Sequence, residues 1–176
     1  MKLTLFTKIL IFCFLTFILN CKRKNKNLTF DDYDKIEHYS TDDNNLILLT
    51  ISSKQYENLN ETENKYIKTL EQNLPKKLTD SSLVYELEKL NFRKEIVKKP
   101  RLDLIREIFS TEFCNSMQQN ACIPEYRDIY IFKKRNRIVG IAKICFECQI
   151  AYFINETQSW ERFGECEKFI KLENLK

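Results

Sequence analysis

An apolar run near the N-terminus, Ile9–Leu19, is the feature that most restricts how this chain can fold. It contains eleven residues and no charge, and the eight residues before it carry two lysines and no acid. A basic segment followed by an apolar one is typical of an export signal. As a helix the run would be about 16 Å long, roughly half of a bilayer's hydrocarbon core, so a membrane-spanning helix is the weaker interpretation. We therefore assign the run to export rather than to a buried first helix.

The apolar run ends in the tetrad Ile18-Leu19-Asn20-Cys21. This segment resembles the lipobox of bacterial lipoprotein signal peptides, although Ile18 stands where that family usually has Leu and Asn20 where it has a small residue. The resemblance implies that residues 1–20 are a signal peptide and that Cys21 is diacylated, with palmitate among its acyl chains, and anchors the protein. It places the protein on the exported side of the cell membrane or outer membrane. An uncleaved N-terminal anchor and ordinary secretion remain as alternatives.

The charge of the chain divides at the end of this segment. Residues 1–26 contain six of the 29 basic residues and none of the 25 acidic ones, which leaves 23 basic against 25 acidic in residues 27–176. Residues 21–27 therefore form a basic tether next to the anchor, where each Lys or Arg near an anionic surface adds about 1 kcal/mol of attraction. The composition supports a membrane as a partner through Cys21. It gives no support to nucleic acid.

The composition also restricts the chemistry. Two glycines cannot supply a phosphate-binding glycine-rich loop. Because His38 is the single histidine, metal clusters and catalytic arrangements that need two histidines are excluded. A lone His acting as a general base would need a partner that the sequence does not place. No nucleophile elbow, zincin motif or recognisable carboxylate pair occurs. We therefore expect no cofactor and find no positive case for an enzyme.

Residues 28–176 are predicted to form one domain, because no repeat and no Pro- or Gly-rich linker divides them. Apolar periodicity predicts three helices. The first runs from Ser53 to about Leu74, before Pro75. The second is capped by Asp80 and ends near Asn91, and the third begins at Pro100.

Other segments are rich in β-forming residues. Residues 31–39 and 46–51 predict one hairpin, residues 126–132 and 138–146 a second, and residues 149–154 a further strand. Asn155 and Gln158 have the spacing of a capping box, which predicts a short helix through Trp160 that ends at Gly164. The fold class is therefore α+β, an antiparallel sheet of about 4–5 strands with helices packed on one face.

Five cysteines remain beyond the signal and anchor: Cys114, Cys122, Cys145, Cys148 and Cys166. If the second hairpin turns at Arg135-Asn136, Asp128 lies opposite Lys143 and Cys122 comes within a residue or two of Cys148. Cross-strand neighbours meet the Cα separation that a disulfide needs. Cys122–Cys148 is the favoured bridge, Cys122–Cys145 is next, and Cys114–Cys166 is a further candidate.

The segment Cys145-Phe146-Glu147-Cys148 is also a C-x-x-C motif. Redox motifs of this kind place the nucleophilic Cys at a helix N-terminus, whereas this one follows an apolar strand and precedes another. A zinc site would need two more ligands, which Cys122 with Cys114 or Cys166 could provide. We keep a membrane-tethered thiol-disulfide protein and a zinc-stabilised domain as alternatives.

The string Cys122-x-Pro124-x-Tyr126-Arg127-Asp128, followed by Ile144 to Cys148, resembles a segment of uncharacterised exported bacterial proteins. The resemblance implies a structural cysteine hairpin and carries no activity. The sequence as a whole predicts a lipid-anchored cell-envelope protein that acts as a binding or interaction module for a protein or small-molecule ligand.

Overall fold

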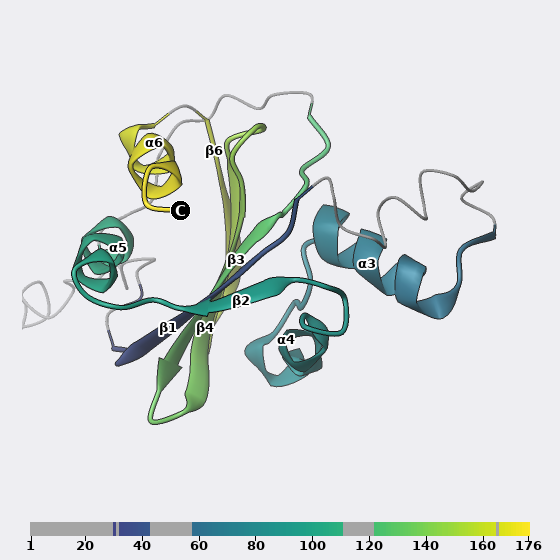
Figure 1. Ribbon diagram of the computed structural model, residues 1–176, viewed down its shortest axis with the longest axis horizontal. Coiled ribbons are helices and arrows are strands. Elements are labelled where there is room, and N and C mark those ends of the chain that lie inside the picture. Colours follow the sequence, from purple (N-terminus) through teal and green to yellow (C-terminus); the bar gives the residue numbers. More distant parts are fainter. Residues whose placement is uncertain (1–29, 31, 43–57, 111–121, 165) are drawn as a thin grey trace, which may run out of the picture.

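The computed structural model describes residues 30, 32–42, 58–110, 122–164 and 166–176. Six strands form one antiparallel sheet in the order β2-β1-β3-β4-β5-β6 (Figure 1). The strands are β1 (Lys35–Ser40), β2 (Arg93–Ile96), β3 (Asp128–Lys134), β4 (Arg137–Cys145), β5 (Ile150–Asn155) and β6 (Ser159–Phe163). The predicted α+β class and antiparallel sheet are confirmed, with six strands in place of the 4–5 expected.

Helices cover both faces of the sheet rather than one. In Figure 1, α3 (Glu61–Glu71) and α4 (Ser82–Glu86) lie on one side, and α5 (Arg101–Ser110) and α6 (Glu167–Glu173) lie on the other. The strand residues alternate between two cores, so Ile129 and Ile131 pack with α3 and α4, while Tyr130 and Phe132 pack with α5 and α6. The expectation of one covered face was wrong because the central strands are apolar on both faces, and each apolar face needs its own cover.

The β3–β4 hairpin turns at Arg135-Asn136, as the sequence predicted. Both residues have positive φ, 49° and 65°, as a tight hairpin turn with strand-compatible twist requires. The backbone N–H of Arg135 donates to Asp34 Oδ2 at 2.9 Å and fixes the turn. A register shift between Phe132 and Lys133 moves the pairs beyond it by one residue, so Asp128 lies opposite Ile144 and not Lys143 as expected.

The helices differ from prediction at their ends. Within the described residues the first helix begins at Glu61, where Asn60 and Glu63 exchange the two hydrogen bonds of a capping box. Asp80 does not cap the second helix, because it lies in the short 3-10 helix η2 (Leu78–Asp80). Ser81 occupies the N-cap position, without a side-chain hydrogen bond to the helix. The third helix follows Pro100 as predicted. The strand predicted at residues 46–51 lies outside the described residues.

Two elements at the sheet edges were missed or misread. β2 carries only exposed residues, so it shows none of the apolar alternation that marks a half-buried strand. The helix predicted after Asn155 is instead β6, paired with β5. Asn155 Oδ1 accepts the backbone N–H groups of Thr157 and Gln158, each at 3.0 Å, in the turn between the two strands. A cap and this Asx turn use the same side-chain hydrogen bond, which explains the error.

Phe30, the first described residue, is anchored in the core under α5. Its backbone N–H donates to the Phe109 carbonyl at 3.3 Å, and its ring stacks on Phe132 with centroids 4.2 Å apart. Gly140 on β4 leaves room for this ring, because a Cβ at residue 140 would overlap Phe30. No helix in the described part of the chain is long and apolar enough to cross a bilayer.

Replacing Gly140 by Ala should destabilise the domain by about 1–3 kcal/mol, because the added methyl group overlaps the Phe30 ring in a packed core. Chemical denaturation of wild type and variant measures the loss. In a Phe30→Ala background the same substitution should cost much less, since the ring is gone. Equal costs in the two backgrounds would show that Phe30 does not occupy this space.

Candidate functional site

The C-x-x-C motif forms the turn between β4 and β5. Cys145 ends β4, and its Sγ accepts the backbone N–H of Cys148 at 3.4 Å. The motif therefore lies between two strands and not at a helix N-terminus. Cys148 is joined by a disulfide to Cys122, with Cα atoms 5.8 Å apart. This is the bridge that the hairpin geometry favoured, and it ties the segment before β3 to the β4–β5 turn.

Cys145 is a free thiol with 1% of its surface exposed. Burial raises the pKa of this thiol, and Glu147 and Glu125 nearby act in the same direction, against the two backbone N–H groups that face the sulfur. A redox nucleophile needs a lowered pKa and access to its partner. Because Cys145 has neither and Cys148 is already paired with Cys122, the geometry opposes the thiol-disulfide alternative.

The other cysteines give no metal centre among the described residues. Cys166, just before α6, is disulfide-bonded. Cys21 and Cys114 lie outside the described residues. No group of three or more His, Cys, Asp or Glu side chains that could hold an ion occurs in the part of the chain that the structure describes. Cysteines held in disulfides cannot serve as the thiolate ligands of the zinc alternative.

His38 has a partner that the sequence did not place. Its Nε2–H donates to Asp128 Oδ1 at 2.8 Å, and its ring stacks on Tyr130 with centroids 4.4 Å apart. The other carboxylate oxygen of Asp128 lies 2.7 Å from Nζ of Lys176. Both His38 and Asp128 are buried. The pair therefore joins β1 to β3 and holds the C-terminal residue, and neither side chain faces an open site.

A second buried carboxylate, Glu37, lies on the opposite face of β1. Lys35 and Lys133 each donate to it at 2.7 Å, and Nζ of Lys94 lies at 3.6 Å. Burial would raise the pKa of Glu37, but the hydrogen bonds from these two lysines and the charges around it lower the pKa to about 2. Glu37 is therefore ionised at neutral pH, and this cluster fixes the charged residues of β1, β2 and β3 in one network.

The most unusual buried group is Lys143 on β4, which has no exposed surface. Its Nζ donates to the Gln72 carbonyl at 2.6 Å and lies 4.5 Å from the centroid of the Tyr126 ring. Burial, with the charge of Lys76 as a second cause, lowers the pKa of Lys143 to about 7. An accessible amine of this kind could act as a base or nucleophile. Here the segment after α3 covers it, so it has no path to a substrate.

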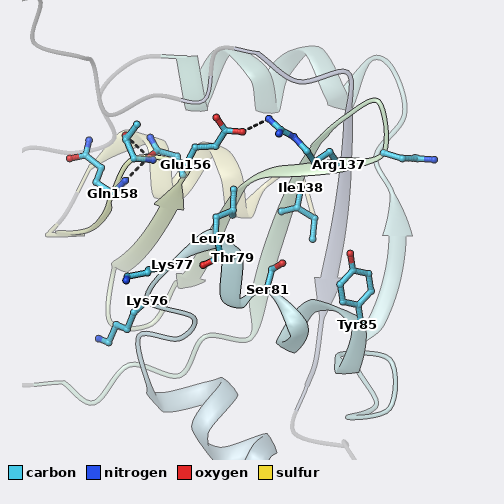
Figure 2. Close-up of a pocket in the computed structure, with 13 residues that line it drawn as sticks. Lys76, Lys77, Leu78, Thr79, Ser81, Tyr85, Arg137, Ile138, Glu156 and Gln158 are labelled. Carbon is cyan, nitrogen blue, oxygen red and sulfur yellow. Dashed lines mark hydrogen bonds and ion pairs between the residues drawn. The ribbon is translucent and has the colours of Figure 1, made fainter.

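A pocket of about 740 Å³ opens beside this segment, between η2 and α4 on one side and the β3–β4 and β5–β6 turns on the other (Figure 2). Leu78 and Ile138 supply apolar contacts, and the rest of the lining is largely polar or charged. The other lining residues are Lys76, Lys77, Thr79, Ser81, Tyr85, Asn136, Arg137, Asn155, Glu156, Thr157 and Gln158. Its volume lies within the range of small-molecule sites. It is the candidate functional site.

The charges of the pocket are unevenly distributed. Arg137, beside the β3–β4 turn, forms an ion pair with Glu156 in the β5–β6 turn (Figure 2). Lys76 and Lys77 are exposed, and neither forms an ion pair with a described residue. Tyr85 lies on the far side of the pocket from these lysines and has 72% of its surface exposed. The pocket thus has a cationic end and an aromatic end, with the hydroxyl groups of Thr79 and Ser81 between them (Figure 2).

Sequence reasoning did not find this pocket, because its walls come from four segments that only the folded sheet brings together. The available signals were the pair Lys76-Lys77 directly after Pro75 and Tyr85 beside the apolar positions of its helix. Comparison with protein-family models, curated proteins and solved structures finds no match for this chain.

Proposed function

We propose that this protein is a lipid-anchored component of the cell envelope, on the exported side of a membrane, and that its domain is a binding module. The observation that carries the anchoring is the tetrad Ile18-Leu19-Asn20-Cys21 at the end of an apolar run, followed directly by a basic segment. Acylation together with a nearby polybasic patch is the combination that gives stable attachment to a membrane.

The position of Phe30 supports the same proposal. Eight residues lie between Cys21 and Phe30, so their Cα atoms are nine steps apart, and Phe30 is fixed against the end of α5. A chain of that length reaches at most roughly 30 Å. An acylated Cys21 would therefore keep the domain close to the bilayer surface. The Cys122–Cys148 disulfide adds support, because such bonds persist in oxidising compartments outside the cytosol.

The pocket supports a binding role for the domain. It is wide enough for a small molecule, it is lined by several hydrogen-bonding side chains, and two lysines at its edge have no ion-pair partner among the described residues. The polar groups buried in the sheet, His38, Asp128 and Lys143, face packed protein instead. We therefore assign the binding function to the pocket and not to the interior of the sheet.

Replacing Cys21 by Ala should release most of the protein from the membrane fraction and abolish labelling by radioactive palmitate, because no other residue would carry the acyl chains. The matched control is Cys13→Ala, which removes a cysteine from the apolar run and should leave retention and labelling unchanged. Full retention with unchanged labelling in Cys21→Ala would contradict lipidation at this residue.

A further inference from the structure

The pocket lined by η2, α4 and the two turns combines features that together specify a ligand class. Its cationic end consists of Lys76 and Lys77, side by side in sequence and both exposed. Glu156, a carboxylate in the same lining, is already paired with Arg137. The two lysines can therefore attract an anionic group without first giving up an ion pair to a described residue.

The electrostatic surroundings strengthen this preference for an anion. Lys76 Nζ lies 5.8 Å from the centroid of the Tyr152 ring, and the positive charge of Lys76 acts on the buried Lys143 behind it. Lys76 thus adds positive charge at the pocket edge that no acidic side chain of the described residues neutralises. A ligand carboxylate or phosphate beside Lys76 and Lys77 would offset this repulsion, and ammonium groups bind such oxygens as point charges.

The remaining lining suits a molecule rich in hydroxyl groups. Thr79, Ser81 and Gln158 offer hydroxyl and amide groups that can both donate and accept hydrogen bonds. Tyr85 lies on the other side of the opening, with its ring exposed (Figure 2). The C–H groups on the face of a sugar ring pack well on an aromatic face, and a tyrosine hydroxyl can bond the ring's oxygens.

We infer that this pocket binds an anionic saccharide, with the acidic group between Lys76 and Lys77 and a sugar ring against Tyr85. The inference rests on the proposed binding role of the domain and specifies its ligand. The acidic group is a phosphate or a carboxylate, both of which present oxygens that two lysines can hold.

The test uses the full-length protein in detergent, applied to immobilised oligosaccharides that are phosphorylated, carboxylated or neutral, with inorganic phosphate as an anion that lacks a sugar. Binding to one or both acidic sets, at least about tenfold tighter than to their neutral counterparts, is expected. The two acidic sets decide between phosphate and carboxylate. Equal binding of neutral and acidic sets, binding of inorganic phosphate alone, or no binding at all would overturn the inference.

Variants locate the binding to this pocket. The double substitution Lys76→Gln and Lys77→Gln should weaken binding of the acidic set about tenfold or more, whereas Lys89→Gln, at an exposed lysine outside the pocket, should leave it unchanged. Tyr85→Ala should weaken binding and Tyr85→Phe should largely preserve it. Unchanged binding in the lysine double variant would overturn the inference. Membrane retention through Cys21 is scored separately, so failure on the saccharides leaves the anchoring proposal standing.

Discussion

A variant that lacks the Cys122–Cys148 disulfide is expected to lose about 3.5 kcal/mol of its free energy of unfolding, because the bond closes a loop with a sequence separation of 26 residues. The suitable form is Cys122→Ser with Cys148→Ala. Cys122 is exposed and tolerates a hydroxyl, whereas Cys148 is buried and does not. Denaturant unfolding without reductant measures the loss.

The structural consequence of this variant should also be local. The disulfide holds the segment that precedes β3, in which Tyr126 donates its backbone N–H to the Leu70 carbonyl at 2.8 Å and its hydroxyl to Asn73 at 2.7 Å. Without the bond, hydrogen exchange at Tyr126 should accelerate more than at the centre of β4.

Cys145→Ala is the matched control, since it removes a nearby cysteine and keeps the bond. It should cost about 1–2 kcal/mol for the lost sulfur contacts. A loss as large as that of the disulfide variant would contradict the role assigned to the bond.

The second large effect is a pH dependence that arises from Lys143. Its pKa is about 7 in the folded protein, against an ordinary value of 10.5. Between these two values the unfolded chain binds a proton at this amine and the folded chain does not, so the free energy of unfolding rises with pH. From pH 7 to pH 9 the rise from this group should be about 2 kcal/mol.

Lys143→Met keeps the length of the side chain and removes the titrating amine. The variant should lose this rise between pH 7 and pH 9, measured as the change in denaturation midpoint. It leaves the Gln72 carbonyl without the lysine donor, at a cost of about 1–3 kcal/mol that does not depend on pH. Lys89→Met, at an exposed lysine, should keep the rise. A Lys143→Met variant with the same pH slope as wild type would show that the amine does not titrate in this range.

Burial shifts the pKa values of Cys145 and Lys143 in opposite directions, and these shifts affect the reactivity of the two side chains. Burial raises the pKa of the thiol and lowers that of the amine, because in each case the charged form is disfavoured. The thiol therefore becomes less nucleophilic and the amine more so. Yet neither group is accessible, and both lie in packed protein. The exposed pocket, whose lysines and aromatic ring are ready for contact, is the better candidate for function.

Local patterns predicted much of the framework. The turn at Arg135-Asn136, the strands β3, β4 and β5, the stop before Pro75 and the start of α5 follow from apolar periodicity and from residues with strong conformational preferences. The position of the hairpin turn was enough to predict the Cys122–Cys148 pairing. The one-residue register shift near Phe132 did not remove it, because cysteines within a residue of opposition still come close enough to bond.

Other features depended on contacts between distant segments. β2 is a strand only because β1 supplies its hydrogen bonds, and Asn155 serves a turn and not a cap because β6 pairs back on β5. The same holds for the partner of His38, which lies 90 residues away in Asp128.

The sequence by itself determined the α+β class and the central hairpin, and it carries the prediction of an export signal with a lipobox and a basic tether, since each of these depends on residues that are neighbours in the chain. Only the tertiary structure decided that both sheet faces are covered, that Lys143 is buried, and that Lys76, Lys77 and Tyr85 line one pocket. The reason is physical: burial and cavities depend on which distant segments pack together, and local periodicity does not specify those neighbours.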